Sequence, residues 1–177
     1  MGVASYIATR QIAALTYSAV QKAEVKRVFE GKRFRKIVDL GCGIGLNGTT
    51  LKSHCDTLIG VDIFKKDLQQ AGWTGFYDEL VVSDVRSYSM PRDADAIVLF
   101  DVLEHLDEND GLMLLEALQA TGAYVLIDTP TQYRRDAFPY IHLSYWSPTK
   151  LQEMGFRVWI INALFGKLTF AEYGGVN

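Results

Sequence analysis

Cysteine is scarce in this 177-residue sequence. The two that occur, Cys42 and Cys55, belong to no CxxC pair and have no histidines at a metal-ligand spacing. We therefore expect neither a disulfide framework nor a metal site. Long hydrophobic runs are also absent, so we expect no membrane-spanning segment and no membrane partner. The N-terminal stretch lacks the continuous apolar segment and the cleavage site of a secretory signal, which favours a cytoplasmic location.

A strong excess of either charge is missing as well. The formal net charge is -3 and the isoelectric point is about 5.6, so we consider nucleic acid an unlikely partner. The hydrophobic fraction of 49% and the charged fraction of 22% are ordinary for a globular protein. We expect one domain over residues 1–177, with an N-terminal helical segment at 1–33 and a core at 34–175. Nothing in the sequence indicates an oligomeric state.

The sequence does contain a regular alternation of short, β-branched apolar runs with segments of helical period. This pattern is typical of an α/β fold with a parallel sheet. Predicted strands cover residues 36–40, 57–63, 79–85, 95–102 and 123–129. Predicted helices cover about residues 12–30, a short stretch after a glycine-rich loop, 65–71 and 108–120.

The C-terminal part predicts one more helix and a hairpin. Ser147 can cap the helix, Pro148 suits its first position, and Gly155 ends it. Two apolar stretches follow, at 156–162 and 167–173. Because the residues between them are too few for a crossover, these stretches must pair as an antiparallel hairpin. We therefore predict a doubly wound, mostly parallel sheet with one reversed strand near its end.

The stretch VDLGCGIGLNGTT at residues 38–50 fits three ligand-binding patterns. It nearly spells a phosphate loop, but Thr49 stands where that loop needs a lysine, so we reject this interpretation. It also contains the GxGxxG of dinucleotide-binding proteins, and Asp62 follows at the distance of their ribose-binding acid. In that pattern, however, the first glycine should make the turn after the strand, and here Gly41 already makes it.

The third pattern, acid-x-G-x-G-x-G, begins at Asp39. An acid inside an apolar strand is costly to bury unless it has a cationic or hydrogen-bonding partner. Glycines let the backbone approach a ligand closely, and the amides of a helix N-terminus bind a carboxylate. Asp62 can hold a ribose diol, and Asp84 can accept a hydrogen bond from the exocyclic amine of adenine. An aminoacyl nucleoside is the ligand that these features share.

Four segments together resemble a known family. VDLGCGIG, GVDI, VVSDV and DAIVLFDVLEHL are similar to the successive motifs of class I S-adenosylmethionine-dependent methyltransferases, over about residues 36–173. The resemblance implies a Rossmann-like sheet of seven strands with the terminal strand reversed, and S-adenosylmethionine as the cofactor. It places the methionine part at Asp39, Gly41, Cys42, Gly43 and Gly45, the ribose and adenine at Asp62, Ile63, Asp84 and Val85, and the methyl group near Phe100, Asp101 and Val102.

Two segments contain candidate residues for the acceptor side. In FDVLEHL, His105 could act as a general base, because the unperturbed pKa of histidine lies near neutrality. Alternatively, Glu104 and His105 belong to the surface opening of the next helix. The connection at 129–146 is long for an α/β fold and rich in aromatic residues, which favours a substrate-facing loop, although these residues could instead seal the core. The candidate substrate-binding residues are Tyr133, His142 and Tyr145.

The predicted function is transfer of a methyl group from S-adenosylmethionine to a hydroxyl or amine of a small molecule by in-line displacement. The run HLSYWSPTKLQEMGF is similar to small-molecule methyltransferases, including those of quinone biosynthesis. Two other interpretations stay open. One is an NAD(P)-dependent oxidoreductase, and the other is a catalytically silent methyltransferase-fold subunit that works with a partner.

Overall fold

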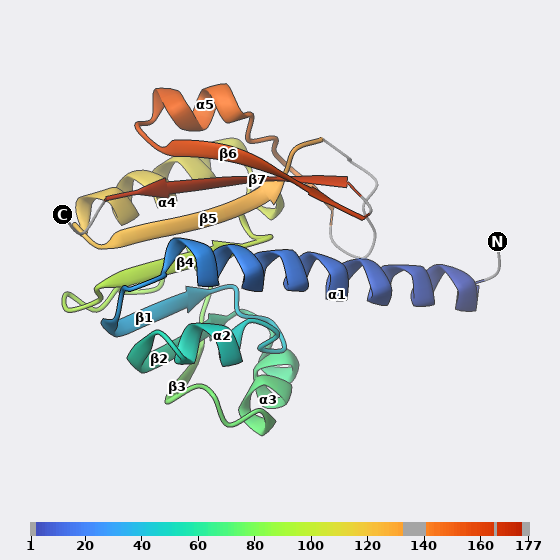
Figure 1. The fold of residues 1–177 in the computed structure, drawn as a ribbon, viewed down its shortest axis with the longest axis horizontal. Helices are drawn as coiled ribbons and strands as arrows, with labels where there is room; N and C mark the ends of the chain where they lie inside the picture. Colours follow the sequence, from blue (N-terminus) through green and yellow to red (C-terminus); the bar gives the residue numbers. More distant parts are fainter. Residues whose placement is uncertain (1–2, 133–140, 165, 175–177) are drawn as a thin grey trace.

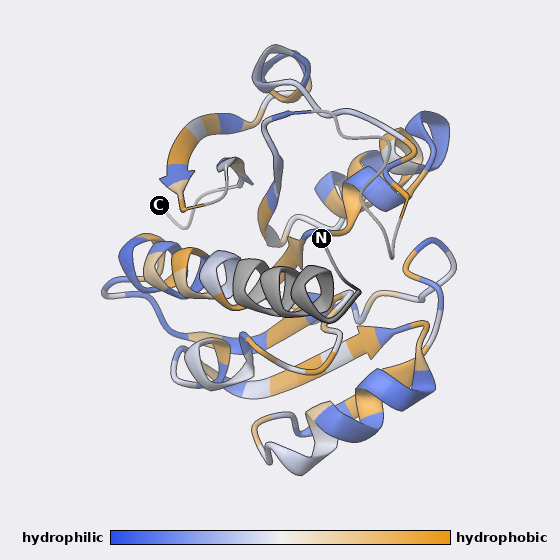
Figure 2. Ribbon diagram, turned by 90° about the vertical axis from the view of Figure 1, so that its right-hand side faces the viewer, coloured by the Kyte–Doolittle hydropathy of each residue, from blue (hydrophilic) through white to orange (hydrophobic). Residues whose placement is uncertain are grey.

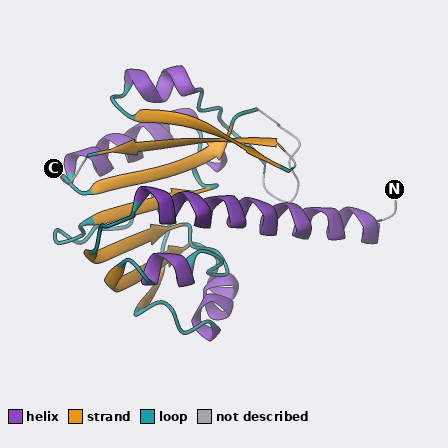
Figure 3. Cartoon of the chain, in the orientation of Figure 1, coloured by secondary structure: helices purple, strands orange, loops and turns teal. Residues whose placement is uncertain are grey.

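The computed structural model describes residues 3–132, 141–164 and 166–174, and the side chains among them from residue 15 onward. A central sheet is flanked by helices (Figure 1, Figure 3). The strands are β1 (Phe34–Leu40), β2 (Cys55–Asp62), β3 (Glu79–Val82), β4 (Ala96–Phe100), β5 (Tyr124–Pro130), β6 (Arg157–Ala163) and β7 (Gly166–Tyr173). The helices are α1 (Val3–Val28), α2 (Gly48–Lys52), α3 (Lys65–Trp73), α4 (Glu108–Ala120) and α5 (Pro148–Glu153), with a 3-10 turn, η1 (Leu103–His105).

The strand order is β3-β2-β1-β4-β5-β7-β6. The pairs from β3 to β5 are parallel, while β7 runs antiparallel to both of its neighbours, β5 and β6. This arrangement confirms the predicted sheet and its antiparallel terminal hairpin. From β1 the chain builds outward to β3 and then returns to place β4 on the other side of β1. Sheets of this kind bind ligands outside the carboxyl ends of the strands, where the order reverses.

Both faces of the sheet are covered, which explains why its central strands are apolar throughout. In β1, Ile37 packs on the face of α1 and α2, while Val38 and Leu40 pack on the face of α4 and α5. The strands at the centre are accordingly largely hydrophobic in Figure 2. The fully buried Trp146 packs in the second of these cores, against α4.

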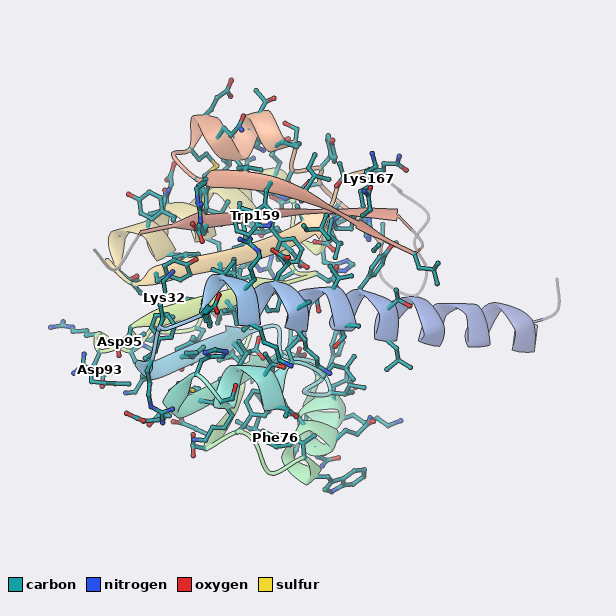
Figure 4. The ribbon with its side chains drawn as sticks, in the orientation of Figure 1. Lys32, Phe76, Asp93, Asp95, Trp159 and Lys167 are labelled. Atoms are coloured by element: carbon teal, nitrogen blue, oxygen red, sulfur yellow. The ribbon has the colours of Figure 1, made fainter. Side chains whose placement is uncertain are left out.

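Helix α1 crosses one face of the sheet and extends past the carboxyl ends of the strands (Figure 1). Glu24 of this helix accepts a hydrogen bond of 2.9 Å from the indole of Trp159 on β6, and that indole stacks on Phe170 of β7 at 5.9 Å. Figure 4 shows Trp159 between the terminal hairpin and α1. The helix begins earlier than predicted, because no proline or glycine interrupts residues 3–11. Among the described residues, no helix is both long and apolar enough to cross a bilayer.

Two strands end earlier than predicted. β3 ends at Val82 rather than at residue 85, because the carboxylate of Asp84 accepts a hydrogen bond of 2.9 Å from the N–H of Arg86 and turns the chain. β4 ends at Phe100 rather than at residue 102, because Asp101 has a left-handed φ of 53° that a strand does not allow. In both places a local side-chain or backbone preference overrides the apolar run.

Helix α5 begins as predicted. The hydroxyl of its N-cap, Ser147, accepts a hydrogen bond of 3.1 Å from the N–H of Lys150, and Pro148 is the first helical residue. Gly155, with a φ of 89°, follows the helix and turns the chain toward β6. These signals are local in the sequence, which is why they could be predicted.

Candidate functional site

The carboxyl ends of β1, β2, β4 and β5 meet at the edge of the sheet where the strand order reverses. The predicted residues that follow β1, β2 and β4 therefore lie together, at the end of the molecule past which α1 extends (Figure 1). Asp84 and Val85 follow β3 instead, at the outer edge of the sheet. The structure thus brings most of the predicted cofactor residues to one place.

The loop after β1 depends on glycine. Gly41, Gly43 and Gly45 have positive φ angles of 77°, 52° and 81°, which other residues rarely adopt. A Cβ atom at Gly41 would also lie 2.4 Å from Cγ2 of Val102, just beyond the end of β4. The loop therefore packs closely on the β4 end, and the backbone of Gly41 and Gly43 stays partly exposed where a ligand can reach it.

Asp62, the last residue of β2, fastens this loop. One carboxylate oxygen accepts a hydrogen bond of 2.8 Å from the N–H of Gly43, and the other accepts one of 2.8 Å from the N–H of Phe64. Asp62 is buried, but each of its oxygens can accept a further hydrogen bond. The side chain of Ile63 beside it is 54% exposed. A ribose at Asp62 and an adenine ring on Ile63 are compatible with this geometry.

Asp39 is buried within β1 and has a partner that the sequence did not reveal. Its carboxylate accepts a hydrogen bond of 2.7 Å from the hydroxyl of Tyr77, in the segment before β3. Burial raises the pKa of Asp39 to about 7, while the hydrogen bond from Tyr77 lowers it and the charge of Asp62 adds to the rise. The Tyr77 ring also fills the space behind the loop, since Cβ atoms at Gly45 and Gly48 would lie 3.0 and 2.7 Å from it. Asp39 and Tyr77 therefore support the loop from the protein side.

Cys42, in the same loop, packs against the inside of the protein. Its side chain is buried, and burial together with the charges of Asp39 and Asp62 raises the pKa of the thiol. The thiol is therefore protonated at neutral pH and a poor nucleophile. It fills a space against β2, because a Cβ atom at Gly60 would lie 2.9 Å from its sulfur.

Asp84 is engaged in an ion pair. Its carboxylate accepts hydrogen bonds from the guanidinium of Arg86, and these hold the pKa of Asp84 below its ordinary value. Arg86 also pairs with Asp110 of α4 at 2.5 Å. The ion pair ties the segment after β3 to α4. The predicted contact of Asp84 and Val85 with adenine stays a prediction.

Two acidic residues, the half-buried Asp101 and the fully buried Asp128, lie at the ends of β4 and β5. The amide of Gln21, on α1, donates hydrogen bonds of 2.8 Å to Asp101 and 3.0 Å to Asp128. The second oxygen of Asp128 accepts a hydrogen bond of 2.9 Å from the N–H of Asp101. Burial raises the pKa of both carboxyl groups. Phe100 and Val102 flank Asp101, so the whole predicted methyl-group region lies beside this carboxylate pair.

Glu104 and His105 form a separate 3-10 turn, η1, rather than the opening of α4. Glu104 is only 3% exposed, so the alternative that placed it on the surface is wrong for this residue. Its carboxylate accepts a hydrogen bond of 3.3 Å from the hydroxyl of Thr129, and burial together with the charge of Asp101 raises its pKa well above the ordinary value. Burial lowers the pKa of His105, which favours the neutral imidazole, while the hydrogen bond to the carbonyl of Ile141 opposes this shift. Its role as a general base stays a prediction.

The three predicted substrate residues lie in the connection after β5. Tyr133 lies outside the described residues. The ring of His142 lies 5.1 Å from that of His105, in an edge-to-face arrangement. The hydroxyl of Tyr145 donates a hydrogen bond of 2.9 Å to the carbonyl of Thr131. The structure thus brings His142, from the connection, to the predicted base.

Four residues of the site were missed or underrated in the sequence. Asp128 shows the signal that singled out Asp39, an acid within an apolar predicted strand, and could have been found in the same way. Glu104 was named, but its burial was not expected. Tyr77 and Gln21 are ordinary residue types in ordinary segments, and no sequence signal marks them.

Residues 11–158 match the family described as a methyltransferase domain. The chain belongs to this family. It is similar in structure to DhpI in complex with SAH (19% identity, 90% of this chain and 86% of that chain covered, TM-score 0.70). It is also similar to magnesium protoporphyrin IX methyltransferase (ChlM) from Synechocystis PCC 6803 with bound SAH (15% identity, 91% of this chain and 83% of that chain covered, TM-score 0.67). A third similar structure is the N-methyltransferase NodS from Bradyrhizobium japonicum WM9 in complex with S-adenosyl-L-homocysteine (14% identity, 88% of this chain and 86% of that chain covered, TM-score 0.69).

The family match confirms the predicted methyltransferase class of enzyme, and the shared architecture confirms the predicted fold. The ligand bound in these similar structures is S-adenosylhomocysteine, the product that S-adenosylmethionine leaves after methyl transfer. This agrees with the predicted cofactor. No curated protein sequence matches the chain significantly. The matches single out no quinone-biosynthesis enzyme, and they favour neither an oxidoreductase nor a silent subunit.

Proposed function

We propose that this methyltransferase-family protein transfers a methyl group from S-adenosylmethionine to a hydroxyl or amine of a small molecule. The observation that carries the proposal is the glycine loop held by Asp62 at the reversal of the strand order, within this family's fold. The loop offers exposed backbone for the methionine part of the cofactor. The remaining oxygen lone pairs of Asp62 are available to the ribose hydroxyls, and Ile63 offers an apolar surface to the adenine.

The acceptor would lie on the β4 side of the loop. Methyl transfer from a sulfonium is an in-line displacement, and the protein contributes mainly by holding the nucleophile, the methyl carbon and the sulfur collinear. Phe100 and Val102 flank the point where β4 ends. His105 follows a few residues later, and the ring of His142 lies against that of His105. A small acceptor suits a chain with no excess of positive charge.

Calorimetric titration with S-adenosylhomocysteine and with NAD(P) tests the proposal. We expect binding of S-adenosylhomocysteine alone. The Asp62→Ala variant should weaken it by about 10- to 100-fold, because hydrogen bonds to a charged group contribute about 1.5–3 kcal/mol. Asp56→Ala is the matched control, since Asp56 lies at the other end of β2 and pairs with Arg33. Binding of NAD(P) alone would show an oxidoreductase, and binding of neither ligand would favour the silent subunit.

A further inference from the structure

Three side chains with metal-binding atoms converge next to the predicted acceptor site. One ligand atom from each of Glu104, His105 and His142 lies within 4.8 Å of the other two. The sequence contains only three histidines, and the structure brings two of them to this cluster. His54 is the third. It directly precedes β2, at the amino ends of the strands, and its ring packs against that of Phe29.

The fold holds the two halves of this cluster together through η1. The carbonyl of Glu104 accepts a hydrogen bond of 2.7 Å from the N–H of Leu143, the residue after His142. The carbonyl of Leu103 accepts hydrogen bonds of 3.0 Å from the hydroxyl of Ser144 and 3.1 Å from the indole of Trp146. These contacts fix the backbone of η1 and of the segment after His142. The proximity of the three side chains therefore follows from the backbone rather than from their own rotamers alone.

The orientation of His105 is that of a metal ligand. Its Nδ1 lies 3.3 Å from the carbonyl oxygen of Ile141, which can only accept a hydrogen bond. A hydrogen bond to this carbonyl requires the tautomer with the proton on Nδ1, which leaves the lone pair on Nε2. Nε2 lies 4.0 Å from a carboxylate oxygen of Glu104. Metal-bound histidines typically donate their other N–H to a carbonyl or carboxylate in this way. The hydroxyl of Thr129 supports the second oxygen of Glu104 in the same manner.

We propose that Glu104, His105 and His142 bind one divalent transition-metal ion, such as Zn²⁺, Mn²⁺ or Co²⁺. One carboxylate and two imidazoles are a donor set for ions of this class rather than for Mg²⁺ or Ca²⁺, which prefer oxygen alone. Metal–ligand distances of about 2.0–2.2 Å place neighbouring ligand atoms about 3–4 Å apart, so the side chains close by about an ångström on binding. This proposal replaces our expectation of no metal site, which considered spacing along the sequence only.

The charge around the cluster also suits a cation. The acids Asp101 and Asp128, which share the amide of Gln21, end β4 and β5 on either side of the turn that contains Glu104. Within the described residues, no lysine or arginine forms a salt bridge with any of these three carboxyl groups. The two histidines are half-buried among the described residues.

The role of the metal rests on the proposed function. A hydroxyl oxygen of the acceptor would occupy a remaining coordination position, where the metal lowers the pKa of the hydroxyl so that its proton passes to water. The oxygen lone pair then forms the new O–CH₃ bond, and the electrons of the broken S–CH₃ bond stay on the sulfur of S-adenosylhomocysteine. In this arrangement His105 holds the metal instead of removing the proton, and the acceptor is a hydroxyl rather than an amine.

Titration of tag-free, chelator-treated protein with Zn²⁺ and with Co²⁺ tests the site directly, by calorimetry and by the visible absorption of bound Co²⁺. We expect one ion per chain. Glu104→Gln, His105→Asn and His142→Asn should each weaken binding by about 10- to 100-fold or more, because even loss of an outer-shell partner has an effect of that size. His54→Asn is the matched control and should bind as the wild type does. Circular dichroism and binding of S-adenosylhomocysteine verify that each variant is folded.

A folded wild type that binds S-adenosylhomocysteine but takes up neither ion would overturn the metal proposal and leave the proposed function intact. Equal affinities in all three ligand variants and in His54→Asn would overturn it as well, because the ion would then bind elsewhere. Stoichiometric metal binding that the ligand variants lose, in a protein that binds no S-adenosylhomocysteine, would support the site and contradict the proposed function.

Discussion

Asp39 and Asp62 are both buried acids at the carboxyl edge of the sheet, but their surroundings differ. Asp62 accepts hydrogen bonds from two backbone amides, one to each oxygen. Asp39 accepts a hydrogen bond from the phenol of Tyr77, and burial raises its pKa to about 7. Asp62 therefore orders the loop directly, while Asp39 forms one polar contact within a strand that is buried from water.

The raised pKa of Asp39 predicts a pH effect on stability. Below about pH 4 this carboxyl is protonated in the folded and the unfolded chain alike. Between pH 4 and about 7 the unfolded chain ionises it and the folded protein does not, so its contribution to the free energy of unfolding falls as pH rises. Asp39→Asn removes this effect, and its stability relative to the wild type should rise by about 1.4 kcal/mol per pH unit over that range.

Urea denaturation of both proteins at pH 4, 5.5, 7 and 8 measures this difference. The gain should level off above about pH 7, where Asp39 is ionised in both states. Asn can still accept the hydrogen bond from Tyr77, so the comparison isolates the charge. A difference between the two proteins that does not change with pH would contradict the raised pKa.

At this scale the sequence predicts what is local and misses what is distant. The glycines of the loop and Asp62 belong to one short motif, and the structure places them as expected. The partner of Asp39 lies 38 residues away, and the carboxylates that Gln21 contacts lie 80 and 107 residues away. No periodicity or spacing rule connects residues so far apart.

Among the elements, η1 and the segment after residue 140 depend on Trp146. This indole is fully buried and donates its N–H to the carbonyl of Leu103 and to the hydroxyl of Ser144. Its ring lies against Gly111 of α4, where a Cβ atom would be 2.2 Å from Cζ2 of the indole. The missing side chain of Gly111 thus makes room for the residue that holds η1 in place.

Gly111→Ala should therefore destabilise the protein, although alanine normally favours a helix by about 1 kcal/mol over glycine. Overpacking a core commonly costs about 1–3 kcal/mol, and we expect a net loss in this range on urea denaturation. Gly72→Ala in α3 is the matched control, because its Cβ would lie an ordinary 3.5 Å from Leu80. The control should be neutral or slightly stabilising. Equal stability of both variants would show that Trp146 moves aside freely.

The sequence predicts elements best where their limits are set by neighbouring residues. Ser147 and Pro148 start α5, and the short link before β7 forces an antiparallel hairpin. η1 was not predicted as a separate element, because its conformation depends on hydrogen bonds from residues 143–146. Its burial, and therefore the environment of Glu104, comes from that tertiary contact.

In the whole molecule, α1 connects the two halves of the site. The carboxamide of Gln21 donates to Asp101 and Asp128 on the proposed acceptor side and accepts a hydrogen bond of 2.9 Å from Asn47, at the end of the glycine loop. Ser18, one turn earlier, donates to the same asparagine at 3.3 Å. The helix thus contacts the end of the glycine loop and the ends of β4 and β5 at once.

Gln21→Leu should lower the stability of the whole protein by about 1–3 kcal/mol, because it removes the side-chain donor that Asp101 and the buried Asp128 share. It should also weaken binding of S-adenosylhomocysteine, since the loop loses its contact through Asn47. Thermal denaturation and calorimetry measure the two effects. Gln69→Leu, on the exposed surface of α3, serves as the control and should change neither quantity. A Gln21→Leu protein with unchanged melting temperature and affinity would show that α1 is not needed at the site.

The order of the sheet has a consequence for synthesis on the ribosome. β7 lies between β5 and β6, although it is made last. While the polypeptide grows, β5 therefore emerges with one row of backbone N–H and C=O groups open, and it keeps this open border until residues 166–173 appear. Unpaired strand borders are templates for association with other chains. A nascent chain that pauses after β5 therefore presents a strand border at which aggregation can begin.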